Sequence, residues 1–307
     1  MKIAFGGNYI EGFRTLQAIV KRHKVAMIFT EMDDERNREI INLAAGGRIR
    51  IFPAAKINDT DVARSMREDG IEVLVCNNFK KIVKRETLNA ARFGGINLHS
   101  SLLPNYRGRA PISWALIRGE KETGITIHYI DETVDGGNII LQEVIPIGDD
   151  DDYRSLLDRN IELEPELVLN ALDLVESGFR GTRQDPHGEI FPYITKEMRV
   201  VDWSWDSRRI YNLIRALVRP FPGAVTYLGS MEYRIWSGRE VESPAGTTGF
   251  VPGEITEVSG NIIRVHAARG TIEIRELEAA TNGENLQELI KGQILSKGLR
   301  FTGSLEA

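Results

Sequence analysis

The stretch IEVLVCNNFKKIVKRETLNAARFGGINLHS, residues 71–100, is the part of the sequence that decides the fold. It contains two apolar runs, 71–76 and 94–100, on either side of a segment with helical character at 85–94. A short run that is apolar at nearly every position is typical of a strand buried on both faces of a sheet. Because a helix lies between the two runs, the stretch predicts two parallel strands joined by a right-handed crossover.

The same alternation of strand and helix continues on both sides of this stretch. The expected strands are residues 1–5, 25–29, 48–52, 71–76, 94–100, 123–130 and 138–147. A long helix expected at 149–178 begins with four aspartates, which complement the positive end of a helix dipole. The pattern predicts an α/β fold, with a Rossmann-like, mostly parallel sheet, in an N-terminal domain of residues 1–190.

The pattern changes after a linker at 181–202. One helix is expected at 207–218, where the prolines of RPFPG end it. Short strands separated by turn residues follow, at 223–229, 232–238, 253–260, 261–270 and 271–280. Closely spaced short strands are typical of a small β-barrel or sandwich, so residues 200–307 are expected to form a β-barrel-like, OB-type domain.

The composition is that of an ordinary globular protein of about two domains. The 307 residues carry a formal net charge of -5, so no strong basic excess points to nucleic acid. Cys76, the single cysteine, stands in an apolar run and is expected in the core. No apolar stretch reaches about 18 residues and no secretory signal pattern is found, so we expect a cytoplasmic protein without a membrane segment.

Common motifs for metals and nucleotides do not occur in the sequence. It has no HExxH, paired CxxC or Walker motif, and no metal is expected. The glycine turn FGGN, residues 5–8, resembles a nucleotide-binding turn but lacks the GxGxxG spacing. We therefore interpret it as a tight strand-to-helix connection.

Asn97 and His99 stand two residues apart at the end of an expected strand, so they point to the same face. Ligands of open α/β sheets gather at the carboxyl ends of the strands. An amide that donates to a developing oxyanion, beside an imidazole that accepts a proton near neutral pH, suits acyl transfer. Asp135 lies in a glycine-rich turn after the next strand and is placed to reach back to His99. Taken alone, these residues also fit a structural pair and an ordinary turn aspartate.

The segment NLHSSLLPNYRGRAP, residues 97–111, resembles the signature of the N10-formyltetrahydrofolate-dependent formyltransferases. The likeness covers the Asn-x-His pair, the SLLP run and RGRAP, and it continues through ETGITIHYIDETVDGGNII, residues 122–140. Asp135 takes the place of the family's catalytic aspartate, so the resemblance makes Asn97, His99 and Asp135 the expected catalytic residues.

By resemblance, the N-terminal domain binds a folate, and the formyl donor is N10-formyltetrahydrofolate. The pterin is expected to dock against the segment after the fourth strand and against the loop that carries the aspartate. The resemblance places these contacts at Asn78, Phe79, Lys80, Ile82, Asp131, Glu132 and Val134. The acceptor amine attacks the formyl carbon directly, Asn97 and His99 contact the formyl oxygen, and either His99 or Asp135 takes the proton.

The expected acceptor is the amino group of a nucleotide-linked amino-deoxysugar, with Arg107 and Arg109 as candidate contacts to its phosphates or to a carboxylate. The alternative is a methionyl-tRNA formyltransferase. Such enzymes typically carry a basic insertion after the second strand, where this chain has the acidic TEMDDERNREI. Basic and acidic residues nearly balance over 201–307, which also counts against tRNA.

A small-molecule nucleotide-sugar substrate, a homodimer and no nucleic-acid partner are therefore expected. Other acceptors, including water, remain as lesser alternatives. A non-catalytic folate- or nucleotide-binding module on the same scaffold is a further alternative, because a fold does not by itself imply a function.

Overall fold

The computed structural model describes residues 1–242 and 251–304. The chain divides into two compact units. The first comprises residues 1–111, 122–146 and 157–191, and the second comprises 112–121, 147–156 and 192–307. The second unit therefore takes two short segments from the N-terminal half of the sequence, which the strand and helix pattern did not indicate.

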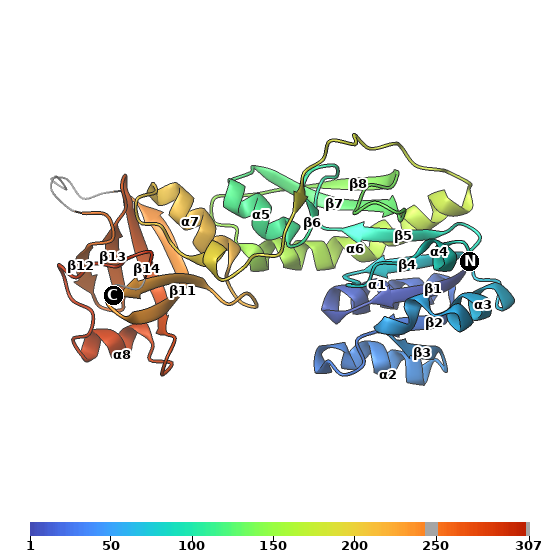
Figure 1. Cartoon of the computed structure of the whole chain (residues 1–307), viewed down its shortest axis with the longest axis horizontal. Helices are drawn as coiled ribbons and strands as arrows, with labels where there is room; N and C mark the ends of the chain where they lie inside the picture. Colours follow the sequence, from blue (N-terminus) through green and yellow to red (C-terminus); the bar gives the residue numbers. More distant parts are fainter. Residues whose placement is uncertain (243–250, 305–307) are drawn as a thin grey trace. The chain divides into compact units, whose positions relative to one another are not determined.

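The first unit, all of whose residues are described, is built on a seven-stranded sheet in the order β3-β2-β1-β4-β5-β7-β8 (Figure 1). The strands are β1 Lys2–Gly7, β2 Lys24–Thr30, β3 Arg50–Pro53, β4 Val73–Asn77, β5 Gly95–His99, β7 Glu122–Tyr129 and β8 Ile139–Pro146. Neighbours from β3 to β5 are parallel, whereas β7 and β8 pair antiparallel. The predicted Rossmann-like, mostly parallel sheet is confirmed.

Helices and short 3-10 helices lie between these strands and after the last of them. They are α1 Tyr9–Arg22, η1 Glu35–Asn37, α2 Arg38–Gly46, η2 Ala54–Asn58, α3 Thr60–Glu68, α4 Arg85–Leu88, α5 Pro111–Arg118 and α6 Tyr153–Glu176. The helix predicted at 85–94 is wrong in length, because α4 ends at Leu88. Beyond it, the backbone amides of Arg92 and Phe93 donate to the carbonyls of Ile71 and Glu72, so the chain joins the start of β4 instead of continuing a helix.

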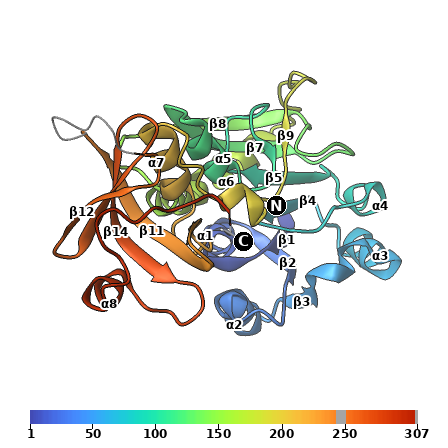
Figure 2. The same ribbon diagram turned by 60° about the vertical axis from the view of Figure 1, so that its left-hand side comes forward.

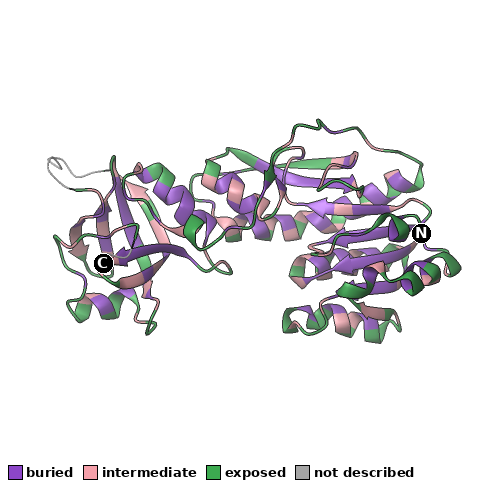
Figure 3. Ribbon diagram, viewed as in Figure 1, coloured by how far each residue is buried: buried purple, intermediate pink, exposed green. Residues whose placement is uncertain are grey.

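The centre of the sheet forms the core of the first unit. All five residues of β4 are buried, as are Ile3, Ala4 and Phe5 on β1. The strands at the centre of this sheet are correspondingly purple in Figure 3. Cys76 is 2% exposed, and burial raises the pKa of its thiol to about 12. It is therefore a core residue and not a nucleophile, because the thiolate is the reactive form.

The second unit contains an antiparallel sheet in the order β10-β11-β14-β13-β12 among its described residues. The elements are η3 Glu197–Arg199, α7 Ser207–Ala216, β10 Ala224–Leu228, β11 Met231–Val241, β12 Ile255–Ser259, β13 Ile262–His266, β14 Thr271–Ala279 and α8 Leu286–Lys291. Figure 2 shows α7, β11, β12, β14 and α8. The segment after α8 contacts both edge strands: Thr302 pairs with Tyr227 on β10, and the carbonyl of Leu299 accepts from the amide of Ile255 on β12. The predicted β-rich C-terminal fold is confirmed, and this segment gives it a barrel-like closure.

The first unit also holds a short parallel pair, formed by β6 Arg107–Gly108 and β9 Ile190–Phe191. Within the part of the chain that the structure describes, every helix is too short or too polar to cross a membrane.

Candidate active site

The carboxyl end of β5 carries two of the predicted catalytic residues. Asn97 and His99 are separated by one residue on this strand, so their side chains leave the same face of the sheet. In the antiparallel pairing with β7, Asn97 stands opposite His128 and His99 stands opposite Thr126. His99 is 7% exposed, which removes most of its ring from water.

The orientation of the His99 ring follows from its hydrogen bond. Nε2 lies 2.8 Å from the carbonyl oxygen of Tyr106. A carbonyl only accepts, so Nε2 carries a proton, and in the neutral ring Nδ1 keeps its lone pair. Nδ1 lies 3.7 Å from Oδ2 of Asp135. The structure thus brings His99 and Asp135 together and points the basic nitrogen of the ring toward the carboxylate.

Asp135 occupies the connection between β7 and β8. Its Oδ2 accepts a hydrogen bond of 2.9 Å from the backbone amide of Gly108, and its Oδ1 lies 3.7 Å from Nε2 of His128. The backbone of Asp135 has φ +49°, a left-handed conformation that is uncommon for residues other than glycine. Such conformations persist where surrounding contacts hold them, and they cluster at functional sites.

His128 is a residue of the candidate site that the sequence analysis did not single out, because it belongs to no motif of its own. Its Nδ1 donates to the carbonyl of Tyr129 at 2.8 Å, which leaves Nε2 as an acceptor, 3.2 Å from Nδ2 of Asn97. Burial lowers the pKa of His128 to about 4, although the carboxylate of Asp135 acts in the opposite direction. His128 is therefore neutral at physiological pH. The only signal for His128 is its position directly opposite Asn97, and this position is known only once β5 and β7 are known to pair.

The segment after β4 is shaped by Asn78 and Phe79, two of the predicted folate contacts. Asn78 has φ +50°, and its Nδ2 donates to Oε1 of Glu11 at 3.1 Å. The ring of Phe79 lies over Gly6, so closely that a Cβ at position 6 would be 3.1 Å from Cδ2 of that ring. The glycine turn after β1 therefore makes room for an aromatic side chain, which agrees with its interpretation as a tight connection.

The rest of this segment is more open. Ile82 is 83% exposed, and its carbonyl accepts from Nδ2 of Asn58 at 2.8 Å. Lys80 donates to the hydroxyl of Tyr9 and stands over its ring, with Nζ 4.5 Å from the ring centroid. The predicted contacts at these two positions are thus available from solvent.

The loop that leads to Asp135 carries the other predicted folate contacts. Oδ1 of Asp131 accepts from the amide of Thr133 at 2.8 Å and also from its hydroxyl, which closes a small turn. Glu132 forms an ion pair of 2.9 Å with Arg85, the first residue of α4. Val134 is 48% exposed.

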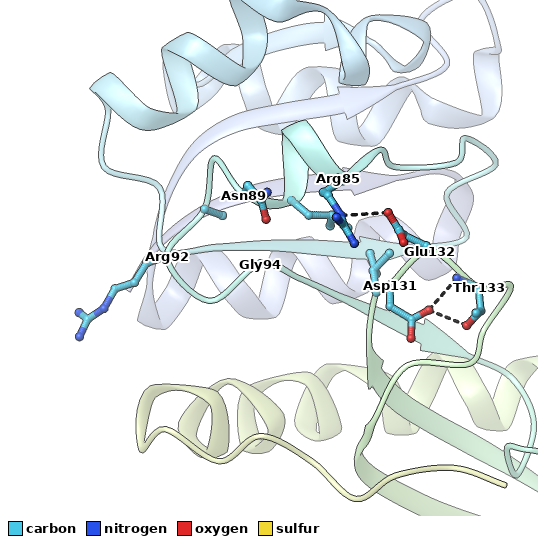
Figure 4. Close-up of a pocket in the computed structure, with 10 residues that line it drawn as sticks. Arg85, Asn89, Arg92, Gly94, Asp131, Glu132 and Thr133 are labelled. Atoms are coloured by element: carbon cyan, nitrogen blue, oxygen red, sulfur yellow. Dashed lines mark hydrogen bonds and ion pairs between the residues drawn. The ribbon is translucent and has the colours of Figure 1, made fainter. Parts of the chain in front are cut away.

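A cavity of about 600 Å³ lies between this loop and the α4 region (Figure 4). Asp131 and Glu132 line it on one side, and the Arg85–Glu132 ion pair joins this side to the opposite one. The sequence reasoning missed the opposite wall, since its residues belong to no motif. That wall contains Arg85, Leu88, Asn89, Ala91, Arg92 and Gly94.

The two arginines predicted to contact the substrate are placed differently. Arg107 is 6% exposed, and its guanidinium donates to Oε1 of Gln184 and to the carbonyl of Asp185, each at 2.8 Å. Arg109 is exposed, and its backbone amide donates to the carbonyl of Phe191. This placement favours Arg109 over Arg107 as a contact to a bound anion.

The fold and this site define a class of protein: an α/β enzyme with an amide, a histidine and a carboxylate gathered around the carboxyl end of a central strand, an arrangement that suits acyl transfer. Residues 17–172 match the formyl transferase family model, and residues 193–293 match the model of the formyl transferase C-terminal domain. The chain belongs to the formyl transferase family.

Two relatives show the likeness over nearly the whole length. The methionyl-tRNA formyltransferase of Pelotomaculum thermopropionicum is 33% identical over 91% of this chain and 91% of its own. That of Fusobacterium nucleatum is 31% identical over 97% of this chain and 99% of its own. Among solved structures, an N-formyltransferase from Helicobacter canadensis in complex with folinic acid and dTDP-3-aminofucose superposes with a TM-score of 0.67. It is 18% identical and covers 90% of this chain and 98% of its own.

These comparisons confirm a formyltransferase and agree with the predicted formyl-folate donor, but they correct the predicted acceptor. The prediction of a nucleotide-linked amino-deoxysugar is wrong, because the relatives that match at 29–33% identity are methionyl-tRNA formyltransferases. The structural likeness to the sugar-acting enzyme, at 18% identity, shows the fold alone. The expectation of no nucleic-acid partner depended on the nucleotide-sugar acceptor, so it is no longer supported.

The error has a physical source, because a count of charges does not say where they lie. Glu273 on β14 has a side chain only 3% exposed, beneath Arg239, Arg264 and Arg275. Those three side chains are 51%, 30% and 46% exposed. An acid that the count treats as surface charge is therefore buried, whereas the arginines around it reach the surface.

Proposed function

We propose that this protein transfers the formyl group of N10-formyltetrahydrofolate to the amino group of methionyl-tRNA. The observation that carries the proposal is the cluster of Asn97, His99, His128 and Asp135, which brings an oxyanion donor and a proton acceptor together around the carboxyl end of β5. The reaction moves a formyl group from one amine nitrogen to another. It needs a donor for the developing oxyanion and an acceptor for the proton of the attacking amine, and it needs no metal-bound nucleophile.

The proton acceptor in this proposal is Nδ1 of His99. The amine of the acceptor attacks the formyl carbon, a new C–N bond forms, and the nitrogen must lose a proton. With Nε2 bonded to Tyr106, the lone pair of His99 is on Nδ1, and the imidazolium that forms is stabilised by Asp135 at 3.7 Å. The bond from the formyl carbon to N10 then breaks, and N10 receives a proton as tetrahydrofolate leaves.

Asn97 supplies the amide that meets the negative charge on the formyl oxygen. One N–H of Nδ2 donates to Nε2 of His128, which fixes the amide with its nitrogen on that side. The second N–H is then held for the developing oxyanion. A preorganised donor of this kind is worth about 10²-fold to 10³-fold in rate.

The donor site in this proposal lies between the segment after β4 and the loop before Asp135. Its contacts are Asn78, Phe79, Lys80, Ile82, Asp131, Glu132 and Val134, with Arg109 toward the acceptor. The exposed apolar side chains of Ile82 and Val134 suit the face of a pterin, because aromatic ligands bury apolar surface on binding. The cavity beside Glu132 and Arg85 adds room on the α4 side.

Two features support methionyl-tRNA as the acceptor. Relatives with that activity align over 91% or more of this chain. Arginines on β11, β13 and β14 of the second unit, with side chains 30% to 51% exposed, offer positive charge to a phosphate backbone, which dominates the affinity of proteins for nucleic acids. We propose domains of residues 1–190 for catalysis and 200–307 for the β-rich part. The homodimer and the cytoplasmic location stay predictions.

The proposal is tested by incubating the protein with N10-formyltetrahydrofolate and methionyl-tRNA. Methionine released from the tRNA should gain the mass of one formyl group, and tetrahydrofolate should appear in equal amount. Free methionine and deacylated tRNA serve as controls and should not react. If methionyl-tRNA stays unformylated while the donor binds, the acceptor assignment is wrong.

A further inference from the structure

We infer that Gln184 is a positioning residue for formyl transfer, holding Asp135 through its backbone. Gln184 is 6% exposed, and its Nε2 donates to the carbonyl of Asp135 at 2.9 Å and to that of Gly137 at 2.6 Å. It therefore binds the backbone on both sides of Gly136, within the turn that carries the Asp135 carboxylate. The inference rests on the proposed function in one respect: the rate of formyl transfer is one of the quantities that test it.

The turn needs such a grip because Asp135 is in an unfavourable conformation. A non-glycine residue at φ +49° is strained and persists only where its surroundings hold it. One anchor is the side chain, through the amide of Gly108. The other is the backbone, through Gln184. Without the second anchor, the backbone is free to relax and carry Oδ2 away from His99.

Arg107 fixes which way the amide of Gln184 points. A guanidinium group only donates, so the atom that faces Nη2 of Arg107 at 2.8 Å must be the amide oxygen. The amide nitrogen then faces the two carbonyls of the Asp135 turn. Arg107 is itself held by the carbonyl of Asp185 at 2.8 Å and is 6% exposed. The chain of contacts runs from Arg107 through Gln184 to Asp135, entirely within the first unit.

Gln184 also has an informative place in the sequence. It lies between residues 172 and 193, where the matches to the two family models end and begin. The segment that leads out of the first unit at Phe191 therefore supplies a brace for the catalytic turn. A loop residue that is buried and uses both ends of its amide has a defined structural task, because each unpaired buried polar group would cost stability.

The test replaces Gln184 with Met, which keeps the length of the side chain and removes the amide. We expect kcat to fall about tenfold to a hundredfold, with the KM for the folate changed less than about threefold, since a misplacement of about 1 Å in catalytic geometry has this effect. The matched control is Asn138→Leu. Asn138 ties the same turn to the same segment, with Nδ2 donating to the carbonyl of Arg180 at 2.9 Å, but it does not touch Asp135.

A double-mutant cycle separates positioning from general stability. If Gln184 acts through Asp135, adding Gln184→Met to Asp135→Asn should lower kcat less than about twofold further, because the two changes remove the same contribution. A purely structural role would lower kcat by the same factor in both backgrounds, and that result would overturn the inference.

Amide exchange of Gly108 gives a readout that does not depend on the acceptor. This amide donates to Oδ2 of Asp135, so its protection reports the position of the carboxylate. We expect protection to drop at least about tenfold in Gln184→Met and to stay unchanged in Asn138→Leu. Unchanged protection in Gln184→Met overturns the positioning role, whereas a wild-type protein inactive on methionyl-tRNA contradicts only the proposed function.

Discussion

Asn97 and His128 face each other across β5 and β7, and Nδ2 of Asn97 donates to Nε2 of His128 at 3.2 Å. The bond exists because His128 uses its other nitrogen on the carbonyl of Tyr129 and because burial lowers its pKa to about 4. A neutral, buried imidazole thus sets the direction of the amide that we propose as the oxyanion donor. Each half of the relationship depends on the register of two antiparallel strands.

Replacing His128 tests this relationship. His128→Leu removes the acceptor and should lower kcat about tenfold, because the Asn97 amide loses its fixed orientation. His128→Gln, whose amide oxygen also accepts, should recover most of the rate. Steady-state kinetics with saturating donor measure both. Equal rates in His128→Leu and wild type would show that the amide is held by other contacts.

The catalytic assignment is tested by His99→Asn and Asp135→Asn. His99→Asn removes the proton acceptor, and Asp135→Asn removes the charge that stabilises the imidazolium, so each should lower kcat by about 10²-fold to 10⁴-fold. Single-turnover rates measure the effect, and thermal unfolding checks the fold. Near wild-type rates in both variants would place the chemistry elsewhere. Loss of activity together with a large fall in Tm would indicate structural roles.

Glu164 on α6 should make stability depend on pH. It is 2% exposed and accepts from Nδ2 of Asn77 at 2.8 Å, and burial raises its pKa from 4.5 to about 8. The folded state therefore holds this proton more tightly than the unfolded state. Its contribution to the free energy of unfolding is fully present below about pH 4.5 and is lost toward pH 8, by up to about 1.4 kcal/mol per pH unit.

Glu164→Gln should remove this dependence and make the protein more stable than wild type at about pH 8–9, because the amide mimics the protonated acid. Urea unfolding at several pH values provides the measurement. Glu166→Gln, at an exposed position of the same helix, is the control and should follow wild type. A parallel decline in Glu164→Gln and wild type would show that Glu164 does not carry the effect.

The arginines over Glu273 should contribute to tRNA affinity. Arg239 and Arg264 stand directly opposite Glu273 on the neighbouring strands, and Arg275 follows it on β14. Replacing Arg239 or Arg275 with Gln should weaken binding of tRNA several-fold at about 0.1 M salt. It should also reduce the slope of affinity against salt by about one unit for each phosphate that is no longer neutralised.

Filter binding or fluorescence titration at several salt concentrations measures this effect. Arg64→Gln, which alters an exposed arginine paired with Asp61 on α3, should leave affinity nearly unchanged. If Arg239→Gln and Arg275→Gln bind tRNA as tightly as wild type, the three arginines serve only to neutralise Glu273.

Local patterns and their limits are clearest at β4 and α4. The run 71–76 predicts a buried strand because all of its residues except Glu72 are apolar, and β4 is buried throughout. The helix expected at 85–94 ends at Leu88 because the amides of Arg92 and Phe93 meet the carbonyls of Ile71 and Glu72. Those partners are distant in sequence, so no local propensity reports them.

The sequence by itself determined the alternation of strands and helices, the shared face of Asn97 and His99, and the family, because these depend on periodicity and on contiguous motifs. Only the tertiary structure decided that His128 meets Asn97, that Arg107 turns inward, and that Gln184 holds Asp135. Strand register and the path of a segment about fifty residues beyond the catalytic turn set these contacts, and neither is encoded in a local pattern. The exposure of the arginines over Glu273 is likewise decided by the tertiary structure, since a count of charged residues does not say which of them reach water.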